Sequence, residues 1–175
     1  MPQGTGRWLR RWSGGFVASV LLFGAGVETA GVHASHVLIP GTTGLIVQSA
    51  IDGATRRLKR PACAALLDEF QASDGLPLAV RLSGLSLTPS EYLGTLWFAD
   101  ADNLTPCHQV AAPIAFTTPG HTVVYVCGHH FMSMYDRNPS YAEILVIHEM
   151  LHAAGLGENP PSSEHISRVA RARCV

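Results

Sequence analysis

The sequence predicts an α+β domain, because its helical and strand patterns come in separate blocks along the chain. Two helical stretches come first after residue 34, several short strands follow, and a long apolar helix and a terminal helix come last. Blocks in this order are typical of the α+β class. Apolar residues make up 47% of the chain and charged residues only 14%, which argues against disorder and against a solvated interaction tail.

The N-terminal segment is predicted to be a signal peptide that is not part of the fold. Arginines between positions 7 and 11 precede an apolar run over residues 14–27, and Val32 and Ala34 supply the small residues of a signal-peptidase site. This order is typical of export signals, and the apolar run is short for a membrane span. We therefore expect cleavage after Ala34 and a single secreted or periplasmic domain over residues 35–175. An uncleaved N-terminal anchor and twin-arginine export are the alternatives.

The cysteines agree with export. Cys63, Cys107, Cys127 and Cys174 all follow the predicted cleavage site, and an even count in an oxidising compartment indicates two disulfides. Three pairings are possible, and we favour Cys107 with Cys127 and Cys63 with Cys174. A cysteine metal site is disfavoured because the chain has no CxxC spacing.

The first half of the domain is predicted to be largely helical. Residues 35–47 are expected to form an extended lead, and residues 48–58 a helix. Pro61 fits the first turn of a second helical stretch that reaches Phe70. Residues 78–82 alternate apolar and polar positions, which is a strand pattern.

The middle of the chain carries the other strand candidates. Residues 96–99 and 114–116 are short apolar runs, and residues 121–127 are rich in β-formers. Residues 128–139 are expected to form a loop. Ser140 and Glu143 then have the spacing of a capping box at the start of the long helix.

The long helix is predicted to be mostly buried and to end at Gly155 and Gly157, because glycine readily adopts a positive φ. Its apolar positions follow helical spacing on one face: Ile144, Ile147, Leu151 and Ala154.

An HExxH sequence lies on this apolar helix, over residues 148–152. His148 and His152 are four residues apart, so both imidazoles project from the same side and can share one tetrahedral zinc ion. Glu149 is rotated about 100° away around the helix. It is well placed to take a proton from a zinc-bound water and act as general base. Polar groups on a buried helix are costly unless partnered, which favours a Zn²⁺ site over chance.

The segment from His148 to Glu158 resembles the extended HExxHxxGxxH/D pattern of the metzincins, a family of zincin-type zinc metallopeptidases. Residues 155–163 are also similar to small exported bacterial HExxH proteins of uncharacterised function. The resemblance implies a minimal zincin-like domain with a small mixed sheet, an active-site helix and a short C-terminal helix. It also implies that Gly155 permits a sharp turn and that Glu158 is the third metal ligand.

The chain departs from the metzincin pattern at two points. Glu158 stands where the family has His or Asp, and no methionine follows Met150 to form the family's methionine turn. Glu164 and His165 therefore remain rival third ligands. Tyr135, Tyr141 and His165 are candidate oxyanion donors, and His129 and His130 are candidates for the border of a cleft.

Two functional classes follow. The first is a secreted zinc peptidase that acts on a peptide or protein substrate, with the substrate backbone pairing along residues 121–127. The second is an exported metal-binding or toxin-like module with a non-catalytic zinc site, which the short segment after His152 favours. The chain has a net charge of −1 and no basic stripe, so a nucleic-acid partner is not expected. We expect no stable membrane insertion after signal cleavage, and the sequence does not predict an oligomeric state.

Overall fold

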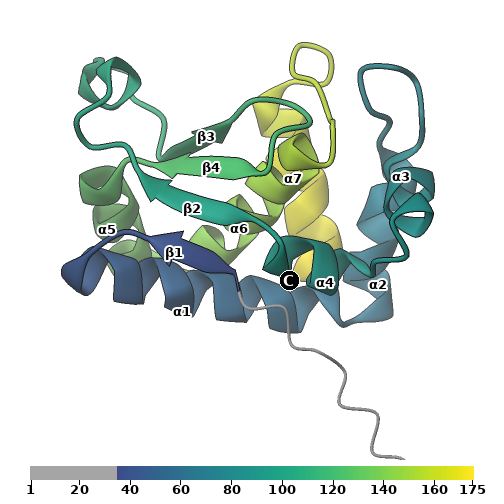
Figure 1. Cartoon of the computed structure of the whole chain (residues 1–175), viewed down its shortest axis with the longest axis horizontal. Coiled ribbons are helices and arrows are strands. Elements are labelled where there is room, and N and C mark those ends of the chain that lie inside the picture. The colour runs from purple at the N-terminus through teal and green to yellow at the C-terminus, as the bar shows by residue number, and fades with distance from the viewer. Residues whose placement is uncertain (1–34) are drawn as a thin grey trace, which may run out of the picture. The chain divides into compact units, whose positions relative to one another are not determined.

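A small mixed sheet and a set of helices packed against it make up the protein, as the computed structural model shows for residues 35–175 (Figure 1). The predicted signal peptide lies outside these described residues. The α+β class predicted from the sequence is confirmed. The helices and strands, in chain order, are β1 His36–Leu38, α1 Gly41–Leu58, α2 Pro61–Ala64, α3 Leu78–Gly84, α4 Pro89–Gly94, β2 Trp97–Asp100, β3 Ala115–Thr117, β4 Val123–Val126, α5 Gly128–Arg137, α6 Pro139–Ala153 and α7 Ser163–Cys174.

The sheet has the strand order β1-β2-β4-β3. Strands β1, β2 and β4 run parallel, and β3 runs antiparallel to β4. Strand β4 therefore forms hydrogen bonds on both sides, while β3 lies at an edge. The prediction that a substrate pairs along residues 121–127 is wrong for this reason, because β4 has no free edge to offer.

Helix α1 begins seven residues earlier than the sequence predicts. Only His36–Leu38 of the predicted extended lead is a strand, and the helix starts directly after Pro40, whose backbone is extended. Gly44, Val47 and Ile51 are buried, so the helical spacing of buried positions continues toward the N-terminus into the predicted lead. The second predicted helical stretch is confirmed as α2 and a short 3₁₀ helix over Ala65–Glu69.

Two further predictions of local structure are wrong. Residues 78–82 belong to helix α3, in which Leu78 and Leu82 are buried while Val80 is 52% exposed. Three alternating apolar residues also satisfy a helical i, i+4 pair, so the pattern does not separate the two structures. The predicted loop after residue 127 is helix α5, which buries Phe131 and Met134 at i, i+3 spacing.

Helix α6 begins at a different cap from the predicted one. The Asn138 side chain accepts a hydrogen bond from the Tyr141 N–H, and Pro139 occupies the first turn. Glu143 instead accepts from the Arg57 guanidinium at 2.5 Å. Gly53 makes room for this contact, since a Cβ there would lie 2.2 Å from the Glu143 carboxylate. The ion pair thus fixes α6 against α1.

Both predicted disulfides are present, between Cys63 and Cys174 and between Cys107 and Cys127. They indicate that the protein matures in an oxidising compartment. The first ties the end of α7 to α2, and the Arg57 guanidinium also donates to the Cys174 carbonyl. Within residues 35–175, the helices do not reach the combination of length and hydropathy that a bilayer crossing requires.

We expect the Cys63–Cys174 disulfide to contribute more to stability than the other one. It joins residues 111 apart in sequence, whereas the second joins residues 20 apart. Loop-closure entropy predicts a loss of about 5 kcal/mol for the double serine variant at 63 and 174, against about 3 kcal/mol for that at 107 and 127. Denaturant unfolding of the two variants and the parent measures this difference, and an equal loss would contradict it.

Candidate metal centre

The two histidines of α6 lie inside the protein with their rings close together and steeply inclined to each other. His148 is 3% exposed and His152 is 5% exposed. Their Nε2 atoms are 3.0 Å apart. Two nitrogens bound about 2.0 Å from one tetrahedral zinc ion would be about 3.3 Å apart. The helix therefore sets the pair at nearly the separation that a shared metal ion requires.

The other nitrogen of each ring is held by an oxygen. His152 Nδ1 lies 2.8 Å from the Leu156 carbonyl oxygen, and His148 Nδ1 lies 3.0 Å from the Ser167 hydroxyl. A carbonyl only accepts, so Nδ1 of His152 donates and its Nε2 keeps a lone pair. The Ser167 hydroxyl is able to accept in the same way, which leaves a second lone pair on Nε2 of His148. Metal-binding histidines are held by partners of this kind.

Burial keeps the His148 imidazole neutral near neutral pH. Burial, and then the neighbouring His152, lower the pKa of His148 to about 3. With both Nδ1 atoms donating, the two Nε2 lone pairs face each other, an arrangement that a cation between them would stabilise. The donor chemistry therefore fits a metal ion.

Gly155 forms the turn that returns the chain, and with it the third candidate metal ligand, toward helix α6. It has a φ of +109°, and a Cβ there would lie 3.1 Å from the Ala72 Cβ. Because only glycine adopts this turn without strain, the chain reverses after α6. Glu158 then joins His148 and His152, with one ligand atom from each residue within 4.8 Å of the others. The three residues predicted as metal ligands are thus brought together, with Glu158 on the exposed side.

Glu149 lies beside this group and is 4% exposed. One of its carboxylate oxygens, Oε2, has no hydrogen-bond partner among residues 35–175. Burial raises the pKa of Glu149 to about 8; nearby Glu158 acts in the same direction, and the Thr117 backbone opposes both. A buried carboxylate with a free oxygen is costly as structure and suited to moving a proton.

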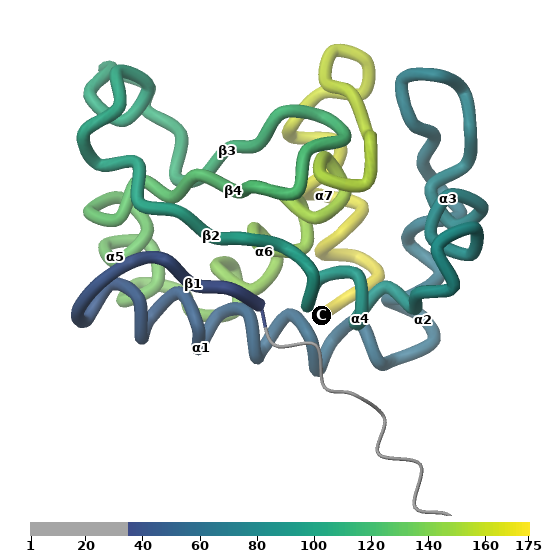
Figure 2. The backbone as a smooth tube through the Cα atoms, in the orientation of Figure 1, coloured from purple at the N-terminus to yellow at the C-terminus, as the bar shows by residue number. Residues whose placement is uncertain are grey.

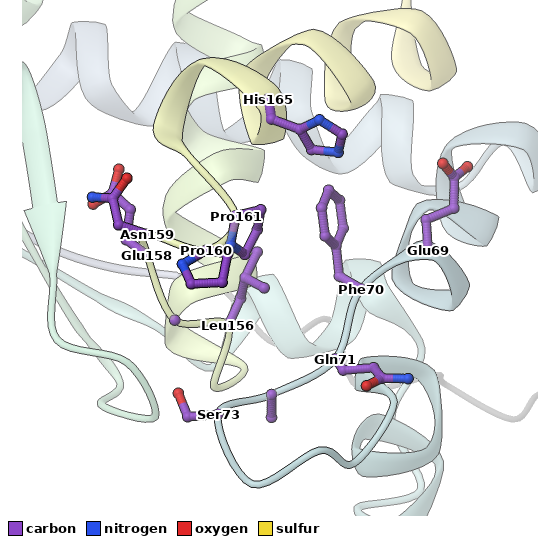
Figure 3. A pocket seen from close by; sticks show the side chains of 12 residues that line it. Glu69, Phe70, Gln71, Ser73, Leu156, Glu158, Asn159, Pro160, Pro161 and His165 are labelled. Atoms are coloured by element: carbon purple, nitrogen blue, oxygen red, sulfur yellow. The ribbon is translucent and has the colours of Figure 1, made fainter.

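The rival third ligands lie elsewhere. His165 stands edge-on to the Phe70 ring, with centroids 6.2 Å apart, and its Nδ1 is 2.8 Å from the Arg168 guanidinium. Figure 3 shows His165 above Phe70, with the Glu158 side chain at the left, beyond Pro160 and Pro161. Glu164 lines a different hollow between α6 and α7. Neither residue belongs to the His148–His152–Glu158 group.

The other candidates are not part of the group either. His129 and His130 lie in the first turn of α5, where His130 Nε2 is 3.3 Å from the Cys107 carbonyl oxygen. Tyr135 packs against the core. Tyr141 lies under the Arg171 guanidinium, two helical turns before His148.

Two residues of the site carry no sequence signal. Ser167 reaches His148 from α7, and Thr117 reaches Glu149 from the end of β3. Neither lies within a recognisable motif, and their positions follow from the packing of α7 and the edge strand on α6. The hydrogen bond from the Gly120 N–H to the His152 carbonyl holds the β3–β4 connection over the same helix end.

Ser167 provides a direct test of this arrangement. Ser167→Ala removes the partner of His148 Nδ1, and we expect it to weaken zinc binding by about 10-fold to 100-fold. Competition with a zinc chelator measures the affinity. Ser163→Ala, on the first turn of the same helix, should leave it unchanged. Equal affinities for the parent and Ser167→Ala would show that Ser167 does not support the ligand.

Comparison with known proteins adds no assignment: no family model, curated protein or solved structure matches the chain.

Proposed function

We propose that the protein is an exported zinc-dependent peptidase of the zincin type. The observation that carries the proposal is the pair of buried Nε2 atoms 3.0 Å apart, on a helix that also buries the unpartnered carboxylate oxygen of Glu149. His148, His152 and Glu158 would hold the ion. Three protein donors are typical of catalytic zinc sites, which leave one position open, whereas structural sites have four. The disulfides support export, because they require an oxidising compartment.

Bound zinc would supply Lewis acidity and lower the pKa of a coordinated water to about 7. We assign the proton transfers of the reaction to Glu149. Its free oxygen would accept a proton from the water that attacks the peptide carbonyl carbon, and it would then deliver that proton to the leaving nitrogen as the C–N bond breaks. A carboxylate whose pKa is raised by burial is a stronger base than an exposed one, and the positive charge of a bound zinc ion would favour its ionised form near neutral pH.

The edge strand β3 is the place where a substrate backbone would lie. Within residues 35–175, β3 pairs with no strand other than β4, so its other edge has no strand partner. Its last residue, Thr117, adjoins Glu149. An extended peptide that adds to this edge would pass the metal ligands, in the manner of other strand-addition complexes.

The second candidate function is a metal-binding module without turnover. The observation that favours it is the small exposed fraction of the two histidines, 3% and 5%, which restricts access to the metal from that side. Exposed Glu158 favours the peptidase, because it leaves the opposite side of the group open to solvent.

One experiment separates the two. Metal analysis of the purified exported protein should find one zinc ion per chain, and a broad peptide library should be cleaved. Chelation should abolish cleavage, and added zinc should restore it. Stoichiometric zinc with no cleaved peptide would favour the binding module, whereas absence of zinc would overturn both functions.

A further inference from the structure

A groove of about 460 Å³ lies between helices α6 and α7, lined by one residue of α6 and five of α7. Figure 2 shows these two helices as neighbouring segments of the trace, with α7 descending toward the C-terminus. The groove shares a residue with the centre, because Ser167 both lines it and holds His148. Its lining residues are Tyr141, Ser163, Glu164, Ser167, Arg168 and Arg171.

Two arginines give the groove a positive charge. Neither Arg168 nor Arg171 forms an ion pair within residues 35–175, whereas Arg57, Arg81 and Arg173 do. Arg171 lies over the Tyr141 ring at 5.2 Å. Arg168 directs one nitrogen to His165. Both guanidiniums thus retain donors for an anion, and the contact with Tyr141 limits the freedom of Arg171.

The groove also contains one acidic side chain. Glu164 is one turn before Arg168 on α7, and it makes no ion pair among the described residues. The lining thus has two positive charges against one negative charge. An incoming anion would be attracted by the two arginines and repelled by Glu164. Removing an arginine should therefore weaken anion binding, whereas removing the charge of Glu164 should strengthen it.

We propose that this groove is a subsite for a carboxylate of the peptide substrate, bound by Arg168 and Arg171. The inference rests on the proposed peptidase function and adds a substrate preference to it. Ser167, which holds His148, and Arg171 are four residues apart on one helix, which is about 6 Å along its axis. An extended peptide covers about 3.3 Å per residue, and the long Arg171 side chain adds its own reach. The carboxylate would therefore lie within about four residues of the cleaved bond.

Two sources supply this chemistry, an aspartate or glutamate side chain and a free C-terminus. Quenched fluorescent peptides separate them. One series places Asp, Asn or Lys at successive positions beside a fixed cleaved bond with an amidated C-terminus. The other series keeps a neutral sequence and varies its length, with either a free or an amidated C-terminus.

The zinc-loaded parent should cleave the best carboxylate peptide about 10-fold to 100-fold faster, in kcat/KM, than its neutral counterpart, as expected for charge-assisted hydrogen bonds. The preference should fall below about 3-fold in Arg168→Gln/Arg171→Gln. Arg171→Gln alone should lose part of it, and Glu164→Gln should increase it. Arg56→Gln removes an exposed charge from α1, at a different hollow, and should keep the parent preference.

Zinc content and melting temperature of each variant should match the parent, which excludes misfolding as the cause. Cleavage with no carboxylate preference, or a preference that survives the double arginine variant, overturns the subsite and leaves the peptidase function intact. Failure to cleave any peptide overturns the peptidase function instead. Fluorescence anisotropy of the same peptides on zinc-loaded protein then still decides the subsite, because equal binding of Asp and Asn peptides would overturn it.

Discussion

Replacing Glu149 with glutamine is expected to lower kcat/KM for peptide hydrolysis by about 10²-fold to 10⁴-fold, the range that general acid–base catalysis contributes. Glutamine keeps the size of the side chain and cannot accept the proton. Zinc content should stay at the parent value, because other groups orient the ligands. Ser167 holds His148, and the Leu156 carbonyl holds His152.

Stability should also be preserved in Glu149→Gln. The carboxylate is buried, and its Oε2 has no hydrogen-bond partner within residues 35–175, so the substitution breaks no bond at that atom. Zinc stoichiometry, melting temperature and kcat/KM measured on one preparation test this. If Glu149→Gln loses zinc together with activity, Glu149 has a structural role. If the variant keeps full activity, the proposed mechanism is wrong.

The local part of the site could be predicted from the sequence. His148, Glu149 and His152 share a helix, so the 3.6-residue period alone fixes their relative directions. Glu158 follows a glycine whose positive φ reverses the chain, which is also a local device. The two disulfides were expected from the even number of cysteines, while the favoured pairing was one of three that the sequence alone does not distinguish.

Features that depend on packing over long sequence distances could not be predicted. Ser167 and Thr117 reach the site only because α7 and β3 lie against α6. No local pattern in the sequence predicts the strand order. Strand β4, which has the strongest strand pattern, lies between two other strands, whereas β3 lies at an edge. Glu143 has the spacing of a capping-box residue relative to Ser140, but its carboxylate pairs instead with Arg57 at the end of α1.

The second large effect concerns the ligands themselves. We expect His148→Ala and His152→Ala each to lower zinc affinity by more than about 100-fold, beyond the loss caused by removing a hydrogen-bond partner of a ligand. Each variant removes one of two buried nitrogens and leaves the other without its counterpart 3.0 Å away. Elemental analysis after dialysis should find no stoichiometric zinc in either protein.

Glu158 completes the test, since it is the exposed member of the group. Glu158→Ala should weaken zinc binding less than the histidine variants do, because solvent can replace an exposed ligand more readily than a buried one. Glu164→Ala is the matched control: it removes the same charge from the groove between α6 and α7 and should leave zinc affinity unchanged. If Glu164→Ala weakens binding and Glu158→Ala does not, the third ligand comes from α7, and the turn at Gly155 serves only to return the chain.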